Sequence, residues 1–178
     1  TNSSSGASER LVCYVPGGRM DYFQGVVIEY LRADRTTFVN TECLLQLEPG
    51  EYLAKGKHWY CDVVAVNFRE SKVFLCEISY SSTLHPLLKR LTSWAESWPL
   101  LCAAVARDCG VPSTWEVRPW LFVPDDRLDA LQKKLALLPT SEASGTRMPE
   151  PKIKSLEQVA PWKYRSWNGK SYDPDADA

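Results

Sequence analysis

The chain has 178 residues, of which 44% are hydrophobic and 24% are charged, and its formal net charge is −1. This size and composition predict one globular domain with a sizeable core, and they exclude a uniformly basic protein. No run of about 18 apolar residues occurs, so the sequence predicts no transmembrane helix and no membrane partner. A local basic patch remains compatible with this net charge, because nucleic-acid binding depends on how charge is distributed.

The first residues of the chain are polar and lack the apolar core of a signal peptide, so we expect a flexible leader over residues 1–18. Apolar residues then recur at helical spacing from Arg19 to Arg32, which predicts the first helix. Residues 36–48 combine threonines with apolar side chains, which favours a strand.

Two nearly continuous apolar runs follow, and they predict neighbouring strands at 58–68 and 73–80 that are covered on both faces. The short polar segment "RESK" between them predicts an antiparallel hairpin. Counting outward from this turn places Val64 near Glu77 and Asp62 near Ser79.

Residues 81–110 are predicted to be helical, with Ser82 or Thr83 as the N-cap, a break at Pro99 and a stop at Gly110.

A strand at 114–124 and an amphipathic helix capped by Asp125 or Asp126 complete the pattern. Strands interspersed with helices indicate an α/β domain over 19–138, with helices on a central sheet. Residues 139–178 are proline-rich and are expected to form a mostly irregular tail.

The chain has six cysteines, and none of them forms a CxxC pair. Several lie inside apolar runs, where a free thiol behaves as a small hydrophobe. We expect buried, reduced thiols in a cytoplasmic protein, since the spacings fit a zinc site poorly.

Each strand of the predicted hairpin contains one carboxylate among apolar residues: Asp62 in the first and Glu77 in the second. An ionised carboxylate is costly to bury unless it is paired or holds a metal. Side chains alternate along a strand, so both acids are expected on one face, at the same end of the hairpin. There they can share a divalent cation. The structural alternative is that Asp62 accepts backbone hydrogen bonds and Glu77 pairs with a buried arginine.

The segment "DVVAV", the turn and the strand that carries Glu77 resemble the signature of the PD-(D/E)XK nucleases, which include restriction endonucleases and Holliday-junction resolvases. The resemblance covers residues 22–123 and implies a restriction endonuclease-like α-β-β-β-α-β core. It also implies Mg²⁺ or Mn²⁺ held by Asp62, Glu77 and the backbone carbonyl of Ile78, with Glu29 of the first helix or Glu42 as a further ligand. The implied reaction is hydrolysis of phosphodiesters, in DNA rather than RNA.

Ser79 stands where the family has its lysine, and a serine hydroxyl cannot supply the lysine's positive charge. Lys89 and Arg90 of the following helix are the nearest cations downstream, so Asp62, Glu77, Ser79 and Lys89 form the candidate catalytic set. The alternatives are a catalytically inactive module of this fold that binds nucleic acid or a protein partner, and an adaptor whose acids are structural.

The segment "KIKSLEQVAPWKYRSWNGK" of the expected tail interleaves basic and aromatic residues. This mixture suits single-stranded nucleic acid, through backbone contacts and base stacking. The alternative is a tail that packs its aromatic residues on the domain.

Overall fold

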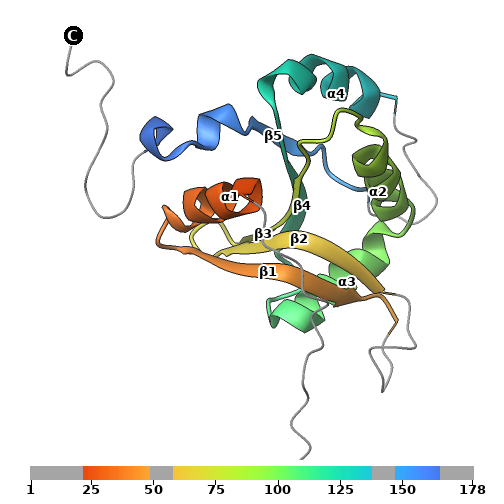
Figure 1. Ribbon diagram of the computed structural model, residues 1–178. Coiled ribbons are helices and arrows are strands. Elements are labelled where there is room, and N and C mark those ends of the chain that lie inside the picture. The colour runs from red at the N-terminus through yellow and green to blue at the C-terminus, as the bar shows by residue number, and fades with distance from the viewer. Residues whose placement is uncertain (1–21, 49–57, 138–146, 165–178) are drawn as a thin grey trace, which may run out of the picture.

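The computed structural model describes residues 22–48, 58–137 and 147–164. These residues form a five-stranded mixed sheet with helices on both faces (Figure 1). The α/β class and the central mixed sheet flanked by helices are therefore confirmed. The expected leader, residues 1–18, lies outside the described residues.

The first half of the chain contains α1 (Tyr22–Arg32), β1 (Thr37–Gln46), β2 (His58–Asn67) and β3 (Lys72–Ile78). The second half contains α2 (His85–Glu96), α3 (Trp98–Cys109), β4 (Glu116–Val123), α4 (Leu128–Leu135) and β5 (Lys152–Ser155). Short 3₁₀ turns follow β4 at Asp125–Arg127 and follow β5 at Glu157–Val159 and Pro161–Lys163. The strand order is β1-β2-β3-β4-β5; the first three strands are antiparallel, whereas β4 and β5 run parallel to β3.

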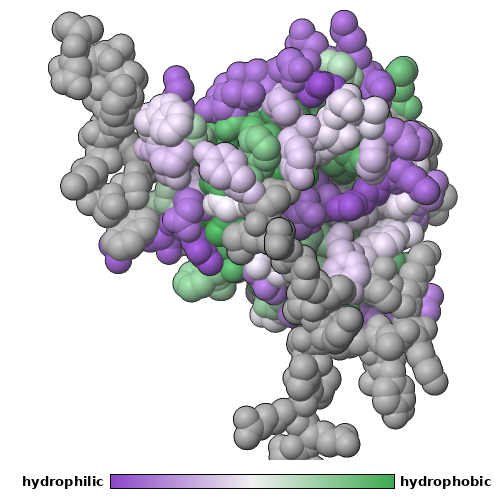
Figure 2. Space-filling view, in the orientation of Figure 1, coloured by the Kyte–Doolittle hydropathy of each residue, from purple (hydrophilic) through white to green (hydrophobic). Residues whose placement is uncertain are grey.

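The sheet is buried on both faces, as the continuous apolar runs of its central strands predict. On one face, α1 packs Val27 and Leu31 against a cluster that includes Val63 of β2. On the other face, α2 and α3 pack a second cluster that includes Trp94 of α2 and Val64 of β2. Consecutive residues of β2 thus belong to different cores, because side chains alternate along a strand. Figure 2 shows hydrophilic side chains over α4 and α2, and apolar surface between these helices and α1.

The long predicted helix breaks where proline requires it. α2 ends at Glu96, and α3 starts at Trp98 with Pro99 in its first turn. Gly110 closes α3 in the left-handed conformation, with φ of 65°, as predicted for a C-cap glycine.

The predicted N-caps are wrong. Leu84 occupies the N-cap of α2, and Arg127 occupies that of α4, without a side-chain cap hydrogen bond in either case. Ser81 instead accepts a hydrogen bond from the Thr83 amide, within the loop that precedes α2.

The predicted register of the β2–β3 hairpin is wrong by two residues. The structure pairs Val66 with Val73 and Val63 with Cys76. The next position in this register places Asp62 opposite Glu77 rather than opposite Ser79. The loop spans residues 68–71, since the Asn67 side chain accepts a hydrogen bond from the Glu70 amide and Ser71 has a positive φ. A shift by two keeps every side chain on its predicted face.

The first part of the expected tail belongs to the sheet. β5 pairs with β4, and the Leu156 amide donates a hydrogen bond of 2.9 Å to the Val123 carbonyl. Leu156 and Val159 are buried in the core that α1 covers. The expectation of an irregular tail is therefore wrong for residues 152–155.

In the part of the chain that the structure describes, five cysteines are free thiols: Cys43, Cys61, Cys76, Cys102 and Cys109. Burial raises the pKa of the Cys61 and Cys76 thiols well above the usual value, so both stay protonated. No helix within the described ranges is long and apolar enough to cross a membrane.

Candidate functional site

Three charged side chains from three elements meet at one end of the β2–β3 hairpin. Arg90 of α2 places Nη1 3.7 Å from Asp62 Oδ1, and the same nitrogen forms an ion pair with Glu77 Oε2. The two acids therefore converge on one cationic atom, on the face of the sheet that α2 covers. The predicted placement of Asp62 and Glu77 on one face is confirmed by these contacts.

Asp62 is held by its neighbours in the sheet and in α1. Its Oδ2 accepts a hydrogen bond of 2.9 Å from the Ile78 amide, which lies just beyond Glu77. Gln24 of α1 donates from Nε2 to the Asp62 backbone carbonyl at 3.2 Å. The first contact orients the carboxylate and the second holds the backbone, while the Asp62 side chain stays 35% exposed, so solvent reaches it.

Glu77 is nearly fully buried, with 3% of its surface exposed. Burial and, after it, the nearby Asp62 carboxylate raise the pKa of Glu77 to about 8, although Arg90 acts to lower it. Among the described residues, Glu77 Oε1 has no hydrogen-bond partner. One oxygen of a buried acid thus remains available for a ligand, a water molecule or a proton.

Arg90 reaches the acids because of its position on α2. Leu87 and Trp94, which precede and follow it by three and four residues, are both buried against the sheet. Arg90 shares their side of the helix, and its side chain is 41% exposed. Its stem therefore lies along the core and its charge lies at the edge of the core.

The other predicted site residues lie elsewhere. Lys89 is exposed, one residue before Arg90, so the cation that contacts both acids is the arginine. Glu29 is exposed and pairs with Arg32 at 3.2 Å, and the α1 side chain that reaches Asp62 is Gln24.

The two residues after Glu77 are held through their backbone amides. The Ile78 amide binds Asp62, and the Ser79 amide donates to the Phe122 carbonyl of β4 at 2.9 Å. Ser79 is half-buried and follows the end of β3 directly. Ser79, which stands where the PD-(D/E)XK motif has its lysine, thus lies two residues after Glu77.

The carboxylate oxygens of this site are the type of ligand that a hard divalent cation prefers. Mg²⁺ takes oxygen ligands and typically uses one or two carboxylates together with water and phosphate. Asp62 and Glu77 offer two carboxylates, and the guanidinium of Arg90 stands at the point between them where a cation would be attracted. In the described part of the chain, no group of three or more His, Cys, Asp or Glu side chains could hold a metal. Arg90 would therefore compete with the ion for the same oxygens.

The comparisons with known proteins give no relative. No protein-family model matches this chain, and no curated protein matches it. The likeness to PD-(D/E)XK nucleases therefore rests on the motif and the order of elements in this chain.

Proposed function

We propose that this protein is a nuclease of PD-(D/E)XK type, with a restriction endonuclease-like core, that hydrolyses DNA phosphodiesters with Mg²⁺ or Mn²⁺. The observation that carries the proposal is the convergence of Asp62 and Glu77 on one cationic atom at the end of the β2–β3 hairpin. The α-β-β-β-α-β order and the position of both acids within it support the same assignment.

Asp62 and Glu77 would hold the metal, with the Ile78 carbonyl as a third oxygen donor. When bound, the ion polarises a phosphodiester oxygen and lowers the pKa of a bound water. The Ile78 amide keeps Asp62 oriented, and a bound cation would favour the ionised form of Glu77, which burial alone disfavours.

Arg90 would take the electrostatic role of the family's lysine. The Arg90 guanidinium supplies the positive charge that the Ser79 hydroxyl lacks. Its planar donors match two phosphate oxygens at once, which suits stabilisation of the negative charge that these oxygens carry in the transition state. Ser79 supplies no charge, and the exposed Lys89 would contact a more distant phosphate of the substrate.

The second candidate is a catalytically inactive module of the same fold that binds nucleic acid or a protein partner. The observation that favours it is the ion pair itself, because Arg90 already neutralises both acids. In this case Asp62, Glu77 and Arg90 form a structural network, and the protein binds no metal there.

Two measurements separate these candidates. The first is the rate of cleavage of supercoiled plasmid with Mg²⁺ and with Mn²⁺. If the protein is a nuclease, this rate should fall by about a hundredfold or more in Asp62→Asn and in Glu77→Gln. The matched control is Asp126→Asn, since Asp126 is exposed and pairs only with its neighbour Arg127 among its described ion pairs. The second is calorimetric titration with Mn²⁺. Binding that disappears in Asp62→Asn supports the nuclease, whereas absence of both binding and cleavage in the wild type overturns it.

Arg90→Gln sharpens the distinction. If Arg90 competes with the metal, this variant binds Mn²⁺ at least as tightly as the wild type yet cleaves more slowly. If the network is structural, the variant binds no Mn²⁺ and only loses stability.

A further inference from the structure

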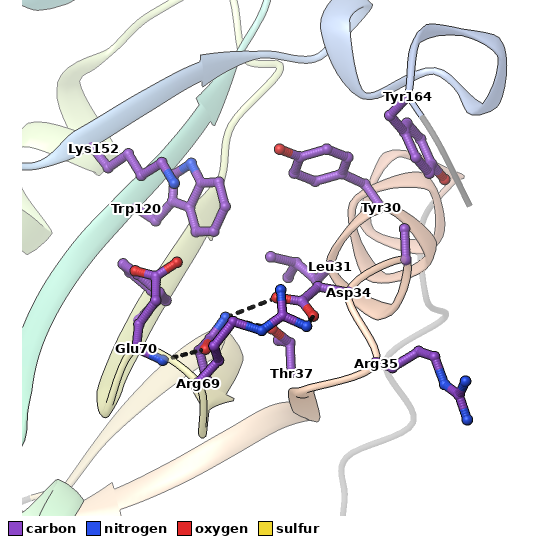
Figure 3. A pocket seen from close by; sticks show the side chains of 13 residues that line it. Tyr30, Leu31, Asp34, Arg35, Thr37, Arg69, Glu70, Trp120, Lys152 and Tyr164 are labelled. Atoms are coloured by element: carbon purple, nitrogen blue, oxygen red, sulfur yellow. Dashed lines mark hydrogen bonds and ion pairs between the residues drawn. The ribbon is translucent and has the colours of Figure 1, made fainter. Parts of the chain in front are cut away.

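A pocket of about 530 Å³ lies on the opposite face of the sheet from Glu77, and nothing in the proposed chemistry uses it. It opens between the end of α1, the β2–β3 loop, β4 and the segment after β5 (Figure 3). Its lining includes Tyr30, Asp34, Arg69, Trp120, Lys152 and Tyr164. In Figure 3 the rings of Tyr30 and Trp120 point toward one another from α1 and β4, while Arg35 points away.

Aromatic rings from three distant parts of the sequence line this pocket. Tyr30 lies 5.1 Å from Tyr164 and 6.0 Å from Trp120 between ring centroids, and both pairs are edge-to-face. Tyr30 and Tyr164 are only partly buried, so part of each ring stays accessible. Such rings stack on a nucleobase with little regard to sequence, because every base has a flat π-face.

Cations surround the same rings. Lys152 Nζ lies 3.7 Å from the centroid of Trp120, which is its partner in the β4–β5 register, and Lys154 Nζ lies 5.1 Å from that of Tyr30. The pKa of Lys152 is lowered, first by burial and then by Lys154 and Arg118, while Glu70 raises it. An anionic ligand would favour the charged form of Lys152, which burial disfavours.

Trp120 supplies the last observation. It is 7% exposed, and its indole Nε1 has no hydrogen-bond partner among the described residues. A buried indole N–H usually finds an acceptor, so Trp120 leaves a hydrogen-bond donor without an acceptor in a residue that lines the pocket.

We propose that this pocket binds an unpaired nucleotide, with the base against Tyr30 and Tyr164 and the phosphate on Lys152 and Lys154. The proposal deepens the proposed function, because the nucleotide would belong to a single-stranded part of the substrate. The same chemistry fits a free mononucleotide. A base within a duplex is excluded, since it must leave the stack before a protein ring can cover it.

Binding is tested without metal, so that cleavage plays no part. Anisotropy of a labelled oligonucleotide in EDTA compares a single strand, the matching blunt duplex and that duplex with a single-stranded tail. We expect the single strand and the tailed duplex to bind roughly tenfold more tightly than the blunt duplex, from the stacking of one base. Competition with dAMP distinguishes two kinds of site. At a mononucleotide site dAMP displaces the labelled strand, and at a site for a longer strand it does not. Either result supports binding of an unpaired nucleotide.

Variants then locate the site. Tyr164→Ala should weaken single-strand binding roughly tenfold, whereas Tyr164→Phe keeps the ring and should bind like the wild type. The matched control is Trp162→Ala, which removes an exposed aromatic residue from the same segment but outside the pocket lining. Lys152→Gln should weaken binding and reduce the salt slope by roughly 0.7, and Lys133→Gln on α4 should do neither.

Two results would overturn this inference. One is equal affinity for the single strand and the blunt duplex, and the other is an equal loss of single-strand affinity in Tyr164→Ala and Trp162→Ala. Asp62→Asn should still bind the single strand fully. Binding without cleavage thus contradicts only the nuclease, and cleavage without single-strand preference contradicts only the nucleotide pocket.

Discussion

Arg90 of α2 contacts Asp62 of β2 and Glu77 of β3 through a single nitrogen, Nη1. One residue thus ties a helix to two neighbouring strands, at the place where a buried acid most needs a counter-charge. The first two predictions concern what this contact contributes to the stability of the protein.

Replacing Arg90 by alanine should lower the free energy of unfolding by about 2 kcal/mol, because Glu77 is left buried without its partner. The loss is smaller than for a fully buried pair, since Arg90 and Asp62 are partly exposed and Glu77 can take up a proton. Urea unfolding measures it, with Lys89→Ala as the control on the same helix. Equal stability of the two variants would show that the ion pair contributes nothing.

The stability of the metal-free protein should fall as the pH rises from about 5 to about 8. Glu77 has a pKa of about 8 in the folded protein and a usual value of 4.5, so the folded state binds its proton more tightly. The free energy of unfolding then decreases with pH by at most about 1.4 kcal/mol per unit within this window, and levels off outside it. The measurement is urea unfolding in EDTA across the pH range. Glu77→Gln, which has no such proton, should lack this slope, and an identical slope in both proteins would contradict the assignment.

Ser79→Lys should raise Mg²⁺-dependent cleavage by roughly tenfold if the protein is a nuclease with a weakened site, because it restores a cation beside the acids. Plasmid cleavage at saturating Mg²⁺ measures it. Ser81→Lys adds the same charge two residues away, on an exposed side chain, and serves as the matched control. An unchanged rate in Ser79→Lys would show that the missing lysine does not limit turnover.

Asp34→Ala should destabilise the fold by about 2 kcal/mol, since the Asp34 carboxylate joins three parts of the chain. It accepts hydrogen bonds from the Thr36 amide and hydroxyl and from Asn67 Nδ2, at 2.9–3.0 Å, and lies 3.5 Å from Arg69. These contacts, led by the Thr36 amide, lower the pKa of Asp34 below 3.8. Its contribution is therefore complete above that pH and is lost on acidification through the lowered pKa. Thermal unfolding at neutral pH tests the prediction, with Asp129→Ala on α4 as the control.

The sequence predicted the faces of the sheet better than the register of its strands. Alternation along β2 and β3 placed Asp62 and Glu77 on one side, and that placement is correct. The pairing was wrong because the loop is set by the Asn67 side chain and by the positive φ of Ser71, which the count of polar residues does not reveal. The corrected register brings the two acids closer together than the sequence suggested.

The position of Arg90 in the sequence distinguishes it from Lys89. Its spacing from Leu87 and Trp94 marks it as the cation on the buried side of the helix, whereas Lys89 lies one residue off that side. β5 carried almost no signal, because a four-residue strand between prolines becomes a strand only through its partner β4. The aromatic pocket could not be predicted either, since Tyr30, Trp120 and Tyr164 are brought together by tertiary packing alone.

The position of β5 has a consequence for how the molecule is made. β5 follows β4 along the chain, so during synthesis β4 presents an unpaired edge until β5 has emerged. A chain cut after α4 would keep that edge permanently and would expose the apolar side of Trp120 and Phe122. Such a fragment should self-associate through open strands, and the nascent protein passes through the same vulnerable stage on every round of synthesis.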